Sequence, residues 1–257
     1  IKDYYQEREK EKGDIKILDI GCGIGIGLTF PIASLFSKKA IDFGIRSYIA
    51  CLFAFLVLRS DIYFVNYFRG FREVGYYSLA VGFCDGIILI ISSIALVLFP
   101  KITENKQLSM ETTLKVSRLS SLFLITVIIF AFLFSKTVIN LFFGSQFINS
   151  LLPLYILLPA IYFWSITNLL NQFFASQGYP WVAVFLWLSG LIVNIILNII
   201  YIPIYGMVAA ALTSLLAYFV TFVLHYFYLQ KFQKVSLLKI LIPNKQEIFK
   251  QLKILKE

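Results

Sequence analysis

The chain has 257 residues, of which 59% are hydrophobic and 14% are charged, and its mean hydropathy is +0.82. An ordinary soluble domain is roughly half apolar and about a quarter charged, so this chain has more apolar side chains than one soluble core can bury. The composition therefore excludes a soluble globular enzyme as an account of the whole chain. It also excludes disorder, which requires low hydrophobicity, and it indicates a membrane protein.

The charged residues gather at the two ends of the chain. Residues 119–230 contain Lys136 as their one formal charge, whereas residues 231–257 hold seven lysines against two glutamates. A basic cluster directly after an apolar segment is typical of a cytoplasmic flank near anionic membrane lipids, so no nucleic-acid partner is expected. The three cysteines have no ligand spacing and the single histidine, His225, is expected at a membrane interface, so we expect no metal site and no cofactor.

The first segment, residues 1–40, carries a glycine-rich motif. A short strand is predicted to end at Asp19, and Gly21, Gly23 and Gly25 then allow the backbone to approach a ligand closely. This motif resembles the first motif of class I S-adenosylmethionine-dependent methyltransferases, and the resemblance implies a loop that cradles the methionine part of the cofactor. A methyltransferase sheet needs roughly a hundred or more further residues, so we do not expect an active methyltransferase here.

Three interpretations of this segment remain open. Residues 17–36 could form a signal-like apolar segment, although Asp19, the glycines and Pro31 argue against it. The chain could be a two-domain protein whose enzyme half lies upstream, although the strand–loop motif normally opens that fold. We favour a junction near residues 36–42 that joins two unrelated segments. Because the chain begins with Ile1, we also expect it to be a fragment or a processed piece.

Six apolar stretches are long enough to cross the membrane as helices, since about 20 residues span its hydrocarbon core. They are 45–67, 77–99, 114–135, 150–173, 181–203 and 206–229. Turn residues or charges separate them, including Gly70, Gly144, Gly178 and the run Pro203 to Gly206. The sequence thus predicts an all-α polytopic membrane protein: a six-helix lobe over residues 41–230, followed by a basic tail over residues 231–257.

The distribution of lysine and arginine predicts the direction of the spans. One side of the membrane would carry Lys38, Lys39, Arg46, Lys101, Lys106, Lys115, Arg118, Lys231, Lys234 and Lys239. The other side would carry only Arg69, Arg72 and Lys136. Because basic residues accumulate on the cytoplasmic side, we expect both ends of the six-helix unit in the cytoplasm.

Ionisable residues inside a span are costly and are therefore candidates for function. Arg59 and Asp61 lie in the first predicted span and Asp85 lies in the second. Residues two apart on a helix point about 200° apart, so Arg59 and Asp61 cannot share a face. Arg59 could present a positive charge to an anionic group, with Asp61 or Asp85 tuning it. Alternatively, Arg59 could form a structural ion pair with Asp85 or reach toward the interface.

Two groups of amides add polar strips to the later spans. Asn168, Asn171 and Gln172 share one face of the fourth span, and Asn194 and Asn198 lie one turn apart on the fifth. Amides offer both donors and acceptors and suit a ligand rich in hydroxyl groups. They also serve as contacts between membrane helices, so both interpretations remain open.

Several motifs of the hydrophobic part resemble those of one transporter family. They are Glu73-Val-Gly-Tyr-Tyr-Ser-Leu-Ala80, Leu98-Phe-Pro100-Lys-Ile102, Leu141-Phe-Phe-Gly-Ser145, and Val193-Asn-Ile-Ile-Leu-Asn198 followed by Ile202-Pro203-Ile-Tyr-Gly206. Residues 42–230 thereby resemble the O-antigen and polysaccharide-unit flippases of the multidrug/oligosaccharidyl-lipid/polysaccharide exporter superfamily.

The resemblance implies the second of two six-helix lobes that face each other around a central cavity. It further implies translocation of a polyprenyl-diphosphate-linked oligosaccharide across the plasma membrane, with no bond chemistry. Such a protein would contact membrane lipids and would need an amino-terminal lobe or a second copy. The pyrophosphate makes Arg59 a candidate contact within a substrate pathway formed by these charged and amide residues. A drug/cation antiporter half of the same superfamily is the alternative, and its carboxylate would be Asp85.

Overall fold

The computed structural model describes residues 17–22, 26–31, 38–104, 108–232, 234–237 and 240. Within this part of the chain, six helices are long and apolar enough to cross a membrane, which confirms the predicted all-α polytopic fold. They are α2 (Lys38–Arg69), α3 (Phe71–Glu104), α4 (Ser109–Phe142), α5 (Leu151–Ser176), α6 (Trp181–Tyr205) and α7 (Met207–Leu229), with a short 3-10 helix, η2 (Ser145–Ser150), before α5. The chain is therefore a multi-pass membrane protein.

Helices α2 to α6 extend beyond the predicted apolar stretches, whereas α7 does not. Gly70 is the single residue between α2 and α3, so α3 begins at Phe71 instead of residue 77. Likewise, Pro203 lies inside the last turns of α6, and only Gly206 separates α6 from α7. Hydropathy thus located the apolar part of each helix and not its ends.

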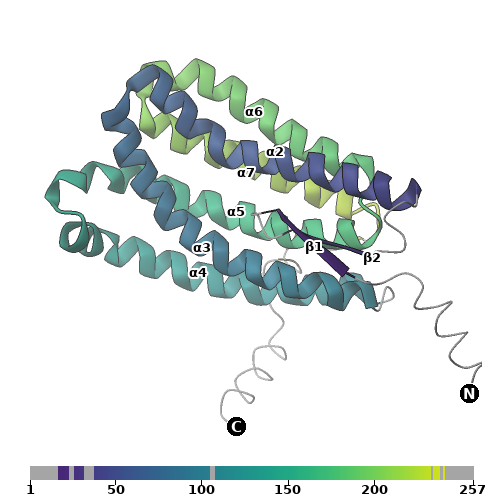
Figure 1. Ribbon diagram of the computed structural model, residues 1–257. Helices are drawn as coiled ribbons and strands as arrows, with labels where there is room; N and C mark the ends of the chain where they lie inside the picture. Colours follow the sequence, from purple (N-terminus) through teal and green to yellow (C-terminus); the bar gives the residue numbers. More distant parts are fainter. Residues whose placement is uncertain are drawn as a thin grey trace, which may run out of the picture.

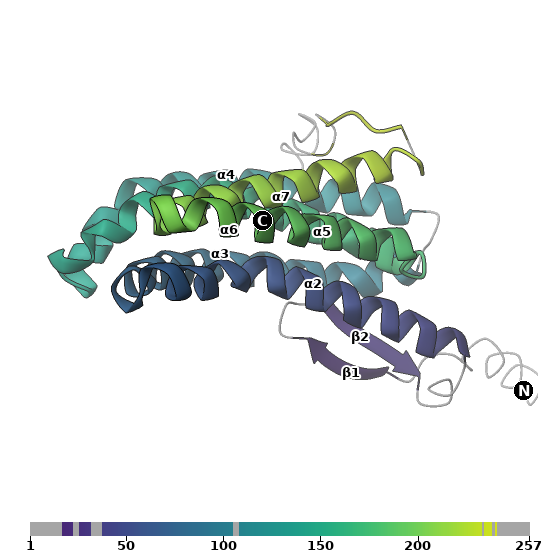
Figure 2. The ribbon, with the colours of Figure 1, turned by 90° about the horizontal axis from the view of Figure 1, so that it is seen from above.

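Helix α5 lies in the middle of the bundle. It packs against α3 and α4 on one side and against α7 on the other, while α2 packs mainly on α6 (Figure 1). Seen from above, the helices run roughly along one common direction (Figure 2). Trp164 of α5 forms the centre of the core, with its ring centroid 4.8 Å from that of Trp187 and 5.2 Å from that of Tyr218. The core thus joins α5, α6 and α7.

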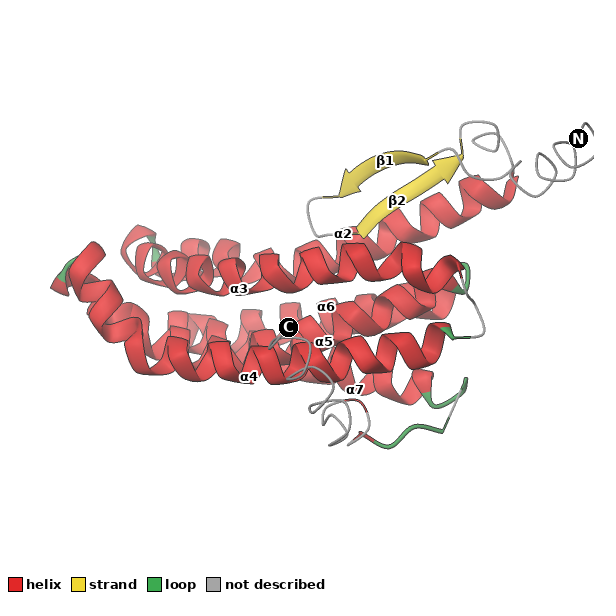
Figure 3. Cartoon of the chain, turned by 90° about the horizontal axis from the view of Figure 1, so that it is seen from below, coloured by secondary structure: helices red, strands yellow, loops and turns green. Residues whose placement is uncertain are grey.

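Two strands precede the bundle. The strands β1 (Ile17–Cys22) and β2 (Ile26–Pro31) pair antiparallel and lie beside α2 (Figure 3). The strand predicted to end at Asp19 continues to Cys22, so Gly21 lies within β1, opposite Gly27. Gly23 and Gly25 lie outside the described residues. The methyltransferase resemblance and the junction near residues 36–42 stay predictions.

Candidate functional site

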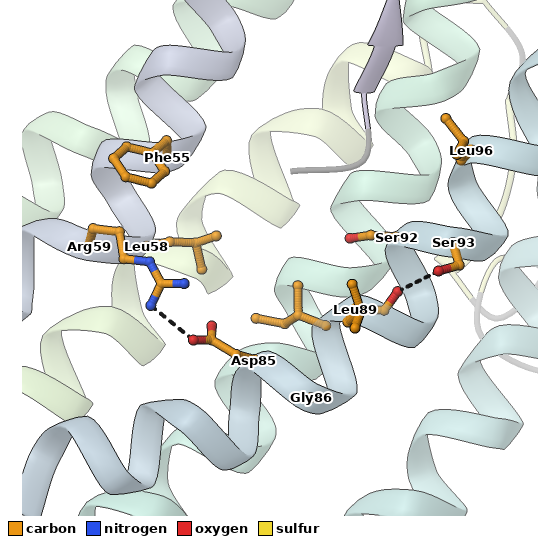
Figure 4. A pocket seen from close by; sticks show the side chains of 10 residues that line it. Phe55, Leu58, Arg59, Asp85, Gly86, Leu89, Ser92, Ser93 and Leu96 are labelled. Carbon is orange, nitrogen blue, oxygen red and sulfur yellow. Dashed lines mark hydrogen bonds and ion pairs between the residues drawn. The ribbon is translucent and has the colours of Figure 1, made fainter. Parts of the chain in front are cut away.

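Helices α2 and α3 border a cavity of about 530 Å³ within their membrane-spanning parts. Its lining is largely apolar and consists of Phe55, Leu58, Arg59, Asp85, Gly86, Ile88, Leu89, Ser92, Ser93 and Leu96 (Figure 4). The formal charges of this lining are those of Arg59 and Asp85. An apolar cavity with a few converging polar groups is the usual form of a binding site, so this is the candidate functional site.

Arg59 and Asp85 form an ion pair across the cavity. The Arg59 Nη1 atom lies 3.0 Å from Asp85 Oδ2, and the two side chains are 31% and 37% exposed (Figure 4). From the sequence, Arg59 could either pair with Asp85 or serve an anionic group. The pairing is present, and its partial exposure to the cavity leaves both groups within reach of a ligand.

One residue of the predicted amide strip on α5 lies against this cavity lining. The Nδ2 atom of Asn168 donates to the hydroxyl of Ser92 at 3.4 Å, and Ser92 in turn lines the cavity. The neighbouring Ser93 donates instead to the carbonyl of Leu89 at 2.9 Å, within its own helix. The cavity is thus linked to α5 through Ser92.

Asp61 lies on a different face of α2 from Arg59. Its carboxylate is only 1% exposed. It accepts hydrogen bonds from the hydroxyl of Tyr77 on α3 and from the Ser214 hydroxyl on α7, the latter at 2.8 Å. The structure therefore places Asp61 in a contact that joins α2, α3 and α7, away from the cavity lining.

The amides of α6 lie in a second interhelical network. Asn194 Oδ1 accepts from the Ser60 hydroxyl at 2.6 Å and from Asn198 Nδ2 at 2.9 Å, and the Thr213 hydroxyl donates to Asn198 Oδ1. All of these side chains are buried. Asn194 and Asn198 therefore connect α2, α6 and α7, as expected for polar contacts between membrane helices.

The other two members of the α5 strip do not line the cavity. Asn171 Oδ1 accepts from the Tyr179 hydroxyl at 2.9 Å and from Trp187 Nε1 at 3.3 Å. Gln172 is buried, and its Nε2 atom has no hydrogen-bond partner among the described residues. Within the predicted strip, Asn168 thus contacts the cavity lining, whereas Asn171 contacts α6 and the turn before it.

No signal in the sequence indicated that Tyr179, in the turn before α6, is buried and contacts other helices. Tyr179 has a φ of +51° and is fully buried, and burial raises the pKa of its hydroxyl above the ordinary value. Its carbonyl accepts from Arg46 Nη1 at 3.3 Å, so Arg46 ties α2 to this turn. The turn-forming residues Gly178 and Pro180 predicted a turn here, but they do not indicate which residues Tyr179 contacts.

The sequence predicted His225 at a membrane interface, and the structure shows which residues surround it. His225 is fully buried, and its Nδ1 atom lies 2.8 Å from the carbonyl oxygen of Thr221. The rings of Phe174 and Trp187 pack against it, with centroids at 5.8 and 5.1 Å. Its position near the end of α7 gives no sign of this burial, which arises because Phe174 of α5 and Trp187 of α6 cover it.

Two of the motifs that carry the family resemblance meet at one end of the bundle. Glu73 Oε2 accepts a hydrogen bond from the backbone N–H of Met207, the first residue of α7, at 2.9 Å. Arg69 Nε donates to Glu73 Oε1 at 2.8 Å. Gly206 has a φ of +61°, and a Cβ atom there would overlap Glu73. We call this group, formed by Arg69, Glu73, Gly206 and Met207, the turn clamp.

The bundle resembles one half of known exporters. A multidrug resistance transporter of the MATE family, in an outward-facing conformation, aligns with a TM-score of 0.68 at 18% identity over 82% of this chain and 49% of that chain. The lipid II flippase MurJ, in an inward closed conformation, aligns with a TM-score of 0.65 at 15% identity over 79% of this chain and 45% of that chain. The bundle thus has the fold of about half of each of these two proteins.

The chain is also similar in sequence to several proteins. Residues 25–152 match a family described as polysaccharide biosynthesis protein. The chain is 26% identical over 181 residues to the probable low-salt glycan biosynthesis flippase Agl15 of Haloferax volcanii, covering 68% of this chain and 38% of that protein. It is 28% identical over 162 residues to an uncharacterized membrane protein of Methanocaldococcus jannaschii, covering 62% of this chain and 38% of that protein.

These matches show that the chain is similar to polysaccharide biosynthesis proteins, and one of its relatives is named as a probable flippase. The chain spans 38% of the length of both curated relatives. The family match begins at residue 25, before the junction predicted near residues 36–42, and the position of that junction stays a prediction.

Proposed function

We propose that this chain is one lobe of a flippase that carries a polyprenyl-diphosphate-linked oligosaccharide from the cytoplasmic to the outer leaflet of the plasma membrane. The similarity to a protein named as a glycan biosynthesis flippase supports this class of substrate. The observation that carries the proposal is the cavity between α2 and α3, with the Arg59 guanidinium in its otherwise mostly apolar lining.

The chemistry of the substrate fits this cavity. A diphosphate is costly to move through hydrocarbon unless a fixed positive charge meets it. Arginine presents a planar set of donors that binds phosphate oxygens in pairs, so Arg59 can hold the diphosphate while the apolar wall accommodates the lipid chain. Ser92 and, behind it, Asn168 then offer hydrogen-bonding groups for the sugar.

Transport in this proposal requires a second lobe. The substrate site would lie between two lobes that rock against each other and open the cavity to either side in turn. The partner would be an amino-terminal lobe or a second copy of this chain. Protein side chains bind and release the substrate, and no covalent bond is made or broken.

The direction of the lobe follows from its charges. Lys101 at the end of α3, Lys115 near the start of α4, and Lys231 just after α7 are all exposed and lie toward one end of the bundle. By the positive-inside rule this end faces the cytoplasm, so both ends of the six-helix unit are cytoplasmic. The tail beyond residue 240 lies outside the described residues.

The alternative function, half of a drug/cation antiporter, requires a carboxylate that is available to a cation. In the spans that the structure describes, Asp85 is paired with Arg59, and Asp61 is held by Tyr77 and Ser214. The adjacent positive charge of Arg59 repels a cation from Asp85, so the cavity suits an anionic group better.

The test is the transport activity of a two-lobed transporter that carries this lobe, measured as surface polysaccharide in cells lacking their own flippase. Arg59→Ala should abolish surface polysaccharide at unchanged protein level, and Arg59→Lys should retain part of it because the charge remains. Arg72→Ala is the matched control, since Arg72 is exposed outside the cavity. Wild-type polysaccharide with Arg59→Ala would remove Arg59 from the site.

A further inference from the structure

In the cavity, the Asp85 carboxylate is paired with the Arg59 guanidinium, which is the group that an anionic substrate would need. Arg59 Nη1 lies 3.0 Å from Asp85 Oδ2. Among the residues that the structure describes, Asp85 is the one ion-pair partner of Arg59. A phosphate that binds the same donors must therefore take the place of the Asp85 carboxylate or share the guanidinium with it.

The environment of the pair makes such an exchange inexpensive. Exposed ion pairs typically contribute only about 0–1 kcal/mol, because water solvates both groups when they separate. Both side chains here are about one-third exposed, at 31% and 37%, and border a cavity of about 530 Å³. Asp85 can therefore stay hydrated after it releases Arg59, and the cavity has space beside the pair for a headgroup.

Asp61 provides the contrast within the same helix pair. It is 1% exposed and accepts hydrogen bonds from Tyr77 and Ser214. Displacing such a carboxylate would leave buried donors without an acceptor, which costs about 1–3 kcal/mol for each group. Of the two carboxylates, only Asp85 has the exposure that exchange requires.

We propose that Asp85 is a specificity-determining residue that occupies Arg59 in the empty cavity and yields it to a phosphate or diphosphate group. A phosphate carries more charge than a carboxylate and offers more oxygen atoms to the guanidinium fork, so it displaces Asp85. A neutral or weakly anionic lipid does not displace it and is rejected. This inference rests on the proposed function, because it assumes that Arg59 receives the anionic group.

The experiment measures binding to the purified 257-residue chain in detergent by isothermal titration calorimetry. Three probes are compared: farnesyl diphosphate, inorganic pyrophosphate and farnesol. Asp85→Asn removes the competing charge at nearly constant shape and should tighten farnesyl diphosphate binding about two- to fivefold, as expected for loss of a partly exposed competing charge. Glu111→Gln is the matched control: it changes the net charge equally at an exposed position outside the cavity and should leave binding unchanged.

A double-mutant cycle separates this effect from a general change in structure. The gain in affinity for farnesyl diphosphate that Asp85→Asn produces should vanish when Arg59→Ala is also present. The variant Asp85→Glu, which keeps the charge, should bind with wild-type affinity. If inorganic pyrophosphate shows the same gain, the headgroup alone is recognised, and if only farnesyl diphosphate shows it, the ligand is a lipid. Equal binding of farnesol would overturn the proposal.

The results distinguish failure of this inference from failure of the proposed function. If Arg59→Ala weakens diphosphate binding but Asp85→Asn leaves it unchanged or weaker, the exchange is refuted and Arg59 remains the anion site. If Arg59→Ala binds diphosphate as the wild type does, the proposed function loses its site and the exchange fails with it. Equal melting temperatures for wild type and Asp85→Asn would establish that the variant is folded.

Discussion

The substitution Gly206→Ala tests the turn clamp directly. Gly206 ends α6 and precedes α7 with φ +61° and ψ −142°, a conformation that residues with a Cβ rarely adopt. A Cβ atom at this position would overlap Glu73 Oε2 and lie 3.0 Å from both Glu73 Cδ and Arg69 Nε. The alanine variant must therefore bear a strained backbone and also push Glu73 away.

The cost follows from these two effects. A backbone held in a sparsely populated region costs about 1–3 kcal/mol. Displacing Glu73 removes the charge-assisted hydrogen bond to the N–H of Met207, and such bonds contribute about 1.5–3 kcal/mol. These two costs are not fully additive, because movement of Glu73 relieves part of the backbone strain. We therefore expect Gly206→Ala to lower the free energy of unfolding by about 2–5 kcal/mol.

The assay is denaturant-induced unfolding of the purified chain in detergent, followed by circular dichroism. Gly82→Ala is the matched control, since Gly82 lies inside α3 and nothing lies within 4 Å of a Cβ built there. Removing a glycine from a helix interior should stabilise the protein by about 0.5–1 kcal/mol. Equal stability of Gly206→Ala and the wild type would refute the reasoning on the turn clamp.

Two further substitutions probe close contacts between helices by the same unfolding assay. Gly190→Ala should destabilise the chain by about 1–3 kcal/mol, because the new methyl group would overlap the Thr221 hydroxyl on α7. Adding Thr221→Ala should recover part of this loss, and no recovery would contradict a direct clash. Asp61→Ala should cost about 2–5 kcal/mol, because it leaves the Tyr77 and Ser214 hydroxyls buried without their acceptor. A loss below about 1 kcal/mol would mean that these donors find other partners.

The number and order of the membrane helices could be predicted from the sequence because each apolar stretch is long enough to cross a bilayer by itself. Their ends could not, since Phe71 and Tyr205 continue helices beyond the apolar core. The burial of His225 was missed for a related reason. Its exposure depends on how far α5 and α6 extend, and hydropathy carries no information on that.

The candidate site was predictable in its parts but not in its assembly. Helical periodicity separates Arg59 from Asp61, but it does not say which neighbouring helix each one faces. The pairing of Arg59 with Asp85 could only be left as one of several options. The contact between Glu73 and Met207 joins residues 134 positions apart, so no local pattern reveals it. Such contacts depend on the packing of whole helices.

The central position of α5 has a consequence for how the protein is made. The span that contains α5 has the lowest mean hydropathy of the six described spans, 1.6. It is nevertheless the second most buried of them, after α7. During synthesis, α3 and α4 emerge before it and can cover one side. However, Asn171 Oδ1 can accept hydrogen bonds from Tyr179 and Trp187 only after α6 has been synthesised. We therefore expect α5 to reach its final packing only after α6 has been synthesised, so that synthesis past α6 is the step that completes the core of the lobe.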